Sequence, residues 1–341
     1  FVLADRNLDR RFEVQKIFAG DHWFARDNIL KLEPAKPEEP HYSGRLVLNP
    51  DFVELFTLGY ISSPNFSATF PAQEIHTHLE WSDLVLNENI LKQIEEIKNW
   101  LVFNKTLAND WKMKDKLIPG FRALFYGPPG TGKTLTATLL GKFTGLKVFR
   151  VDLSTVVSKY IGETEKNLAD LFRKAEQYNW ILFFDEADSL FARRTNIKDS
   201  HDMYANQQVS YLLQRSATCK CLVICATNYK ANIDQAFSRR FNTCIPFLLP
   251  NEEERIRIWR SAFPAGIRFE NDVDLPALIG RFEISGGNII NAVQYACLKS
   301  LARGNDKVIY IQDTLDGIEK EIAKEGKVYN SQVAVEILSS N

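Results

Sequence analysis

The clearest candidate for a functional site is a glycine-rich stretch, residues 127–134, that reads Gly-Pro-Pro-Gly-Thr-Gly-Lys-Thr. Glycines at this spacing let successive backbone N–H groups turn inward around phosphate oxygens, and a following helix points its positive end at the same charge. Lys133 would then reach the β- and γ-phosphates of a nucleoside triphosphate, and Thr134 would ligate Mg²⁺. The stretch follows the apolar run ALFY and precedes a helical pattern, which is the context this motif requires. The residues predicted to bind the nucleotide here are Gly127, Pro128, Pro129, Gly130, Thr131, Gly132, Lys133, Thr134 and Leu135.

Two adjacent acids form a second candidate site. Residues 181–190 read ILFFDEADSL, which places Asp185 at the carboxyl end of an apolar strand, where ligands bind in open α/β sheets. Asp185 would hold Mg²⁺, usually through water, and Glu186 would accept a proton from the attacking water. Alone, such an acidic run is more often a solvated turn. Because it follows a phosphate-binding loop, we interpret it as the metal-binding and catalytic pair of a site that hydrolyses a nucleotide.

Alternating helical and strand patterns must position these residues. Nearly continuous apolar strands that alternate with helices favour a parallel sheet buried on both faces. Beyond Pro250 the pattern changes to amphipathic helices. The predicted fold class is α/β: a parallel-sheet core that carries the phosphate loop, a small all-helical lid domain after it, and a small N-terminal accessory domain. Strands are expected at residues 122–126, 148–152, 180–184, 221–226 and 243–247.

The length of 341 residues is enough for two or three domains. Residues 33–40, EPAKPEEP, are rich in proline and glutamate and predict a linker or an exposed turn. We expect an accessory, substrate-recognising region at 1–80, a large α/β nucleotide-binding domain at 81–248, and a small helical domain with a C-terminal tail at 249–341.

Composition and charge exclude several kinds of partner. With 42 Lys plus Arg against 43 Asp plus Glu, the net charge of -1 creates no overall field that would draw the chain to nucleic acid or to an anionic membrane. The apolar runs are far shorter than the roughly 20 residues that span a bilayer, and no secretory signal is recognisable, so we expect a cytoplasmic protein with no membrane partner.

Cysteine and histidine residues are further candidates as metal ligands. The chain has five cysteines but no C-x-x-C pair, which favours buried thiols in a reducing compartment over a zinc site. His76 and His78 alternate onto one face of a possible strand, but without a third ligand the pattern favours an exposed strand.

Taken together, these motifs resemble those of the AAA family of P-loop ATPases, over roughly residues 81–323. The resemblance implies an ATP- and Mg²⁺-dependent ATPase that works as a ring of identical chains, usually a hexamer. Residues 226–241, ATNYKANIDQAFSRRF, resemble the family's second region of homology. On this resemblance Asn228 is the sensor that orients water against the γ-phosphate. Arg239 and Arg240 are then arginine fingers that reach into the neighbouring subunit's site.

A second loop is interpreted through the same resemblance. Residues 158–168, SKYIGETEKNL, resemble the pore loop of members that thread polypeptides. Tyr160, Ile161 and Gly162 would then face the ring axis and grip an extended protein chain. The alternative is that Tyr160 packs on its own domain, as apolar side chains generally do.

Two segments resemble the family's adenine-binding side. Residues 81–86, WSDLVL, resemble the segment that covers adenine, which assigns Asp83 and Leu84 to the nucleotide site. Residues 285–288, SGGN, resemble the helix start near the ribose and adenine, where this chain offers no arginine as a second sensor.

The function that these features favour is ATP-driven remodelling, unfolding, assembly or disassembly of protein substrates. The alternatives are a nucleic-acid machine of the clamp-loader or helicase type and a scaffold that uses ATP only to assemble. The apolar Tyr160–Ile161 pair argues against the first, and the intact Glu186 and Asn228 argue against the second. The whole chain also resembles bacterial AAA ATPases, including those encoded beside contractile injection systems, which implies a sheath or tail component as the protein substrate.

Overall fold

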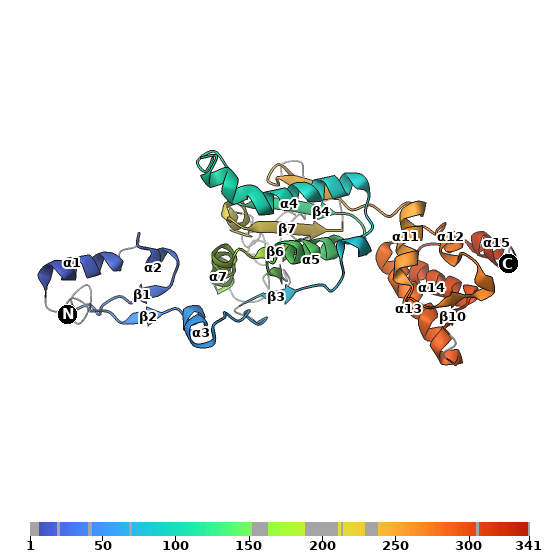
Figure 1. Ribbon diagram of the computed structural model, residues 1–341, viewed down its shortest axis with the longest axis horizontal. Helices are drawn as coiled ribbons and strands as arrows, with labels where there is room; N and C mark the ends of the chain where they lie inside the picture. The colour runs from blue at the N-terminus through green and yellow to red at the C-terminus, as the bar shows by residue number, and fades with distance from the viewer. Residues whose placement is uncertain are drawn as a thin grey trace, which may run out of the picture. The chain divides into compact units, whose positions relative to one another are not determined.

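The computed structural model describes residues 7–18, 21–39, 43–67, 70–151, 163–187, 211–212, 214–228, 238–304 and 307–339. The chain divides into two compact units, Phe1–Pro64 and Asn65–Asn341 (Figure 1). A boundary at residue 80, as expected from sequence, would separate strand β3 (Ala72–Ile75) from the sheet in which it pairs with β5 (Val148–Val151). Main-chain pairing therefore joins this part of the expected N-terminal region to the larger unit.

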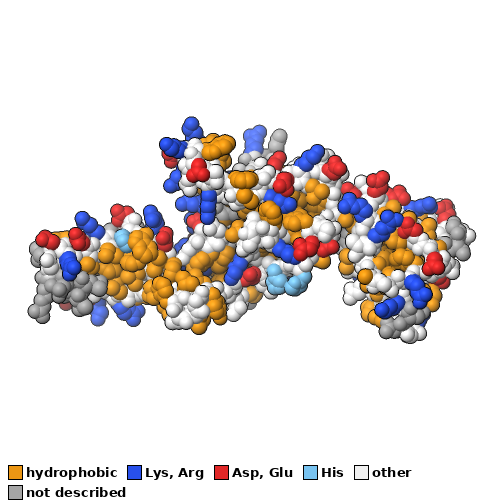
Figure 2. Space-filling view, viewed as in Figure 1, with side chains coloured by type: hydrophobic (Ala, Val, Ile, Leu, Met, Phe, Trp, Pro, Cys, Tyr) orange, Lys and Arg blue, Asp and Glu red, His pale blue; other side chains and the backbone are white. Residues whose placement is uncertain are grey.

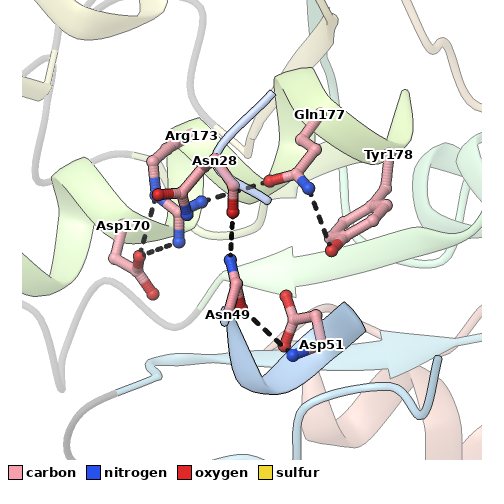
Figure 3. Close-up of polar contacts among 7 residues, drawn as sticks. All are labelled: Asn28, Asn49, Asp51, Asp170, Arg173, Gln177 and Tyr178. Atoms are coloured by element: carbon pink, nitrogen blue, oxygen red, sulfur yellow. Dashed lines mark hydrogen bonds and ion pairs between the residues drawn. The ribbon is translucent and has the colours of Figure 1, made fainter. Parts of the chain in front are cut away.

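The N-terminal unit is built from short elements. Helices α1 (Leu8–Ile17) and α2 (Trp23–Arg26) precede the antiparallel pair β1 (Leu30–Leu32) and β2 (Leu46–Leu48), and α3 (Pro50–Leu58) follows. Asn49 caps α3, because its Oδ1 accepts a hydrogen bond from the Asp51 N–H at 3.0 Å while its Nδ2 donates to the Asn28 carbonyl at 2.9 Å (Figure 3). Proline at the first helical position and left-handed Gly59 at the end fit the same helix.

This unit leaves apolar side chains in contact with solvent. None of its described residues is buried, and the space-filling view shows hydrophobic side chains over its surface (Figure 2). Phe56 and Tyr60 are 69% and 61% exposed. A unit with so little core offers apolar surface to a partner.

The larger unit contains a six-stranded sheet in the order β3-β5-β6-β7-β4-β8. Its strands β4 to β8 are parallel to one another, and β3 is antiparallel at the edge (Figure 1). The parallel-sheet core predicted from the apolar runs is therefore confirmed. The remaining strands are β4 (Phe121–Tyr126), β6 (Ile181–Phe184), β7 (Leu222–Thr227) and β8 (Thr243–Pro246).

Both faces of the sheet are buried, which explains why its strands are apolar at nearly every position. Along β6, Leu182 and Phe184 pack into one core and Ile181 and Phe183 into the other. Helix α7 (Glu163–Tyr178) covers the first face. Helices α4 (Glu88–Asn109) and α5 (Lys133–Thr144) cover the second.

Helix α7 also carries a short chain of partly buried polar contacts. Arg173 pairs with Asp170 and donates from Nη1 to Gln177 Oε1 at 3.1 Å, and Gln177 donates to the Tyr178 hydroxyl at 3.2 Å (Figure 3). Spacings of three and four residues place the first three of these side chains on one helix face.

The C-terminal part of the larger unit packs helices around Trp259, which is fully buried. Its helical character was predicted, and the structure adds a short parallel pair of strands, β9 (Arg268–Phe269) and β10 (Val308–Ile309). The helices are α11 (Glu252–Ala262), α12 (Leu275–Ile279), α13 (Gly286–Arg303), α14 (Ile311–Lys324) and α15 (Ser331–Ser339).

The cysteines differ from the expected set of buried thiols. Cys219 and Cys221 form a disulfide, because the turn before β7 brings their Cα atoms to 5.4 Å. Cys225 is a buried free thiol, and Cys244 and Cys297 are free and partly buried. None of the helices that the structure describes combines the length and the apolar character that crossing a bilayer requires.

Candidate functional site

The glycine-rich stretch forms the loop that joins β4 to α5. Gly132 is the N-cap of α5 and has a left-handed φ of 97°. A Cβ at this position would lie 2.9 Å from Leu84 Cδ1, the end of a side chain that can move, so the backbone conformation is what favours glycine. The amino end of α5 and its N–H dipoles therefore open directly onto the loop, which is the arrangement that binds phosphate.

The ammonium group of Lys133 bonds to the phosphate loop and to the residue that follows β7. Its Nζ donates to the carbonyl oxygens of Gly127 at 2.7 Å and Pro128 at 2.8 Å, and to Asn228 Oδ1 at 3.0 Å. The side chain is only 7% exposed, so its charge is stabilised by neutral oxygen acceptors. A bound phosphate would offer this buried cation a stronger, charged acceptor.

The acidic pair lies at the carboxyl end of β6, beside β7. Ala187 donates its N–H to the Ala226 carbonyl at 2.8 Å, which fixes the end of the acidic pair to β7. Glu186 has a left-handed φ of 49°, and its N–H donates to Asp185 Oδ1 at 3.0 Å. Such a backbone conformation is uncommon for a residue with a side chain and is concentrated at functional sites.

A cavity of about 620 Å³ joins these groups, and its volume lies in the usual range for small-molecule sites. Gly127 and Pro128 contribute through their carbonyl bonds to Lys133 instead of lining the cavity. The predicted residues that line it are Asp83, Leu84, Pro129, Gly130, Thr131, Gly132, Lys133, Thr134, Leu135, Asp185, Glu186 and Asn228.

One wall of this cavity is apolar. Leu86 and Ile90 come from the segment at the start of α4, and Leu249 and Ile290 come from the linker before α11 and from α13. These apolar side chains line the same cavity as the phosphate loop, and the combination suits a flat heterocyclic base attached to phosphates.

The donor set fits Mg²⁺. Thr134 and Asp185 supply a hydroxyl and a carboxylate to the same cavity, and Mg²⁺ is commonly held by one or two such oxygens together with phosphates and water. Among the described residues no group of three or more His, Cys, Asp or Glu side chains could hold a metal ion by itself. His76 and His78 stack edge to face after β3 with ring centroids 5.8 Å apart.

Arg239 and Arg240 are exposed and do not line this chain's own cavity. Asn242 anchors the turn that carries them: its N–H donates to the Arg122 carbonyl at 2.8 Å, and its Oδ1 accepts from the Arg122 N–H at 2.9 Å. The predicted pore-loop residues Tyr160, Ile161 and Gly162 lie outside the described residues.

One contributor to the site was missed from sequence. Arg255 in α11 is buried, and its Nε and Nη1 donate to the carbonyls of Gly280 at 2.7 Å and Pro250 at 2.6 Å. Burial lowers the pKa of this guanidinium. Because Pro250 lines the cavity, Arg255 holds one of its walls. The only sequence signal was a basic residue on the apolar side of an amphipathic helix.

Residues 123–249 match a family described as "ATPase family associated with various cellular activities (AAA)". This stretch is therefore similar to AAA ATPase domains. The phosphate loop, acidic pair and Asn228 described above all lie within the matched range.

Three curated proteins are similar to part of this chain. The A-like 1 form of the katanin p60 ATPase-containing subunit from Danio rerio is 29% identical over 242 residues, which cover 66% of this chain and 47% of that protein. The protein of the same name from Mus musculus is 30% identical over 241 residues, with the same coverage. "Cell division cycle protein 48 homolog" from Archaeoglobus fulgidus is 31% identical over 221 residues, or 63% of this chain and 30% of that protein. The chain thus spans about half or less of the length of these relatives.

A solved structure supports the fold. The crystal structure of the FIGL-1 AAA domain superposes with a TM-score of 0.57 and covers 79% of this chain and 90% of that chain, at 20% identity. The AAA-domain fold therefore extends beyond the range matched by the family.

Proposed function

We propose that this protein is a ring-forming ATPase that uses ATP hydrolysis to remodel protein substrates. The observation that carries the proposal is the set of polar side chains around one cavity: Lys133 bonded to Asn228, with Asp185 and Glu186 at the end of the adjacent strand. These side chains can bind phosphate, hold a metal ion and activate the attacking water. What the set lacks is a cation from a second copy of the chain that reaches the γ-phosphate.

Each residue has a role in this proposal. The loop N–H groups and Lys133 bind the phosphates, and Thr134 and Asp185 hold Mg²⁺, which neutralises charge on the phosphates when bound. Glu186 accepts the proton of the attacking water, and Asn228 orients that water. Electrostatic stabilisation of the transferred group is then completed by an arginine of a second copy.

Arg239 and Arg240 are the proposed trans-acting arginines. They are exposed and absent from the cavity of their own chain, as groups that serve a neighbouring site must be. An arginine finger contributes about a thousandfold or more to the rate in P-loop enzymes. Hydrolysis should therefore require assembly, and a hexameric ring is the proposed oligomer.

Assembly and turnover can be tested together. ATP hydrolysis per chain should rise steeply with chain concentration and level off where sedimentation shows a closed oligomer, with Lys133→Ala as the blank. Arg240→Ala mixed with Glu186→Gln should recover part of the activity, because some mixed interfaces pair an intact finger with an intact glutamate. Hydrolysis at full rate by dilute monomers would refute the proposal.

The substrate is proposed to be a protein chain gripped by Tyr160, Ile161 and Gly162. Tyr160→Ala should remove the stimulation of ATP hydrolysis by an unfolded protein, whereas Tyr160→Phe should retain it. The exposed apolar side chains of the N-terminal unit, such as Phe56, support a role for that unit in substrate recognition. A sheath or tail component of a contractile injection system, handled in the cytoplasm, is the proposed substrate.

A further inference from the structure

Glycine backbones of the phosphate loop and of the first turn of α13 lie directly against each other. The Gly287 N–H donates to the Gly130 carbonyl at 2.9 Å. A Cβ added to Gly130 would lie 2.5 Å from Ser285 Oγ and 3.2 Å from the Gly287 Cα, and a Cβ added to Gly287 would lie 3.0 Å from the Gly130 Cα. Because the atom that faces Gly287 belongs to the backbone, no side-chain rotation can relieve that crowding.

The first turn of α13 is also tied to the rest of the helical part. Ser285 caps the helix by accepting from the Asn288 N–H at 3.3 Å. The Asn288 side chain donates to Glu325 Oε1, at the end of α14, at 2.6 Å. Glu325 in turn pairs with Lys327 at 2.6 Å. Hydrogen bonds therefore link this turn to the end of α14.

The contact lies at the wall of the nucleotide cavity. Gly130 and Lys133 line the cavity from the loop, and Gly287 and Ile290 line it from α13. The separation of Gly130 from Gly287 therefore sets how closely the apolar wall of α13 approaches the phosphate-binding groups. Closer walls exclude water and slow the escape of a bound ligand.

We propose that Gly287 is a positioning residue for the nucleotide site: its bare backbone holds α13 against Gly130, and the closeness of this contact limits the rate at which nucleotide leaves. Gly287 acts on the nucleotide through the loop and the wall, not as a catalytic group. The proposal requires only that the chain binds nucleotide, and it is independent of ring formation and of protein remodelling.

A pair of alanine variants isolates the contact. Gly287→Ala and Gly286→Ala make the same replacement in the first turn of the same helix, so their effects on helix propensity are matched. A Cβ at Gly286 would lie 3.4 Å from the Gly130 carbonyl oxygen and 3.6 Å from Ile258 Cδ1, which is ordinary contact. Only Gly287→Ala pushes against the backbone of the phosphate loop.

The measurement is the dissociation rate of a fluorescent ADP analogue from the full chain, followed by stopped flow in the presence of Mg²⁺. Gly287→Ala should release the analogue about tenfold faster than Gly286→Ala, a difference of about 1.4 kcal/mol. Gly287→Val should release it faster still. The KM for ATP should rise with the release rate while kcat changes less, a split that a general loss of folded protein would not produce.

Equal release rates from the two alanine variants would overturn the proposal, as would faster release from Gly286→Ala. If Gly287→Ala does not fold, Asn288→Ala provides the second variant, because it loosens the same turn without adding an atom. Release about threefold faster from Asn288→Ala supports the proposal, and an unchanged rate overturns it.

Discussion

Replacement of Arg255 by methionine removes a buried contact that joins α11 to α12 and to the linker before α11. Arg255 donates from Nη1 to Pro250, in the linker that lines the nucleotide cavity, and from Nε to Gly280, at the end of α12. Methionine retains the apolar stem but has no donor, so both carbonyls lose this partner in a buried setting.

The size of the effect follows from these two bonds. A hydrogen bond to a charged group contributes about 1.5–3 kcal/mol, so losing two costs about 3–6 kcal/mol. Removing the buried cation offsets part of this free-energy cost, because burial disfavours the charged guanidinium and lowers its pKa. We therefore expect a net loss of about 3 kcal/mol in the free energy of local unfolding of α11 and α12, roughly a hundredfold change in the opening equilibrium.

Hydrogen exchange measured by mass spectrometry resolves this local change, which a single melting temperature of a multidomain chain would not. Peptides that cover residues 250–262 and 275–282 should exchange about a hundredfold faster in Arg255→Met, with Arg255→Lys intermediate. Arg257→Met is the matched control, because Arg257 lies two residues further along α11 and is exposed. If Arg255→Met and Arg257→Met exchange at the same rate, the Arg255 contact does not hold the linker.

Other changes probe the site and the core. Lys133→Ala should weaken ATP binding at least about a hundredfold, because a buried cation can no longer pair with phosphate; isothermal titration measures this. Glu186→Gln should bind ATP with affinity close to that of the unaltered chain but hydrolyse it about a thousandfold more slowly, as phosphate release would show. Burial raises the pKa of Cys225 to about 12 from 9.0, so iodoacetamide at about pH 8 should label it only after unfolding. Because the folded state keeps a proton that the unfolded chain releases, this thiol should also make stability fall as pH rises from 9.0 to about 12.

Each of these expectations has a contrary result. Equal losses of ATP affinity in Lys133→Ala and Glu186→Gln would remove the distinction between a phosphate-binding and a catalytic residue. Rapid labelling of Cys225 in the folded chain, located by peptide mapping, would contradict its burial. A Cys225→Ala variant with the same alkaline loss of stability would assign that loss to another group.

The amino-acid sequence by itself was enough to predict the strands of the core and the glycine-rich loop between β4 and α5. Both depend on short-range patterns: β6 is apolar at each position because both of its faces are buried, and the loop needs glycine spacing followed by a helix start. The position of Asp185 and Glu186 at the end of a strand could also be predicted, since it depends on a single apolar run before them.

The tertiary structure alone decided which distant segments meet. Three examples are the pairing of β3 at the sheet edge, the hydrogen bond from Lys133 to Asn228, and the hydrogen bond from Arg255 to Gly280. In each case the sequence around one residue does not indicate which distant residue it contacts. The same holds for Gly130 and Gly287, whose significance is that neither has a side chain where two backbones touch. Local propensity acts over a few residues, whereas such contacts arise only when burial of apolar faces brings distant segments of the chain together.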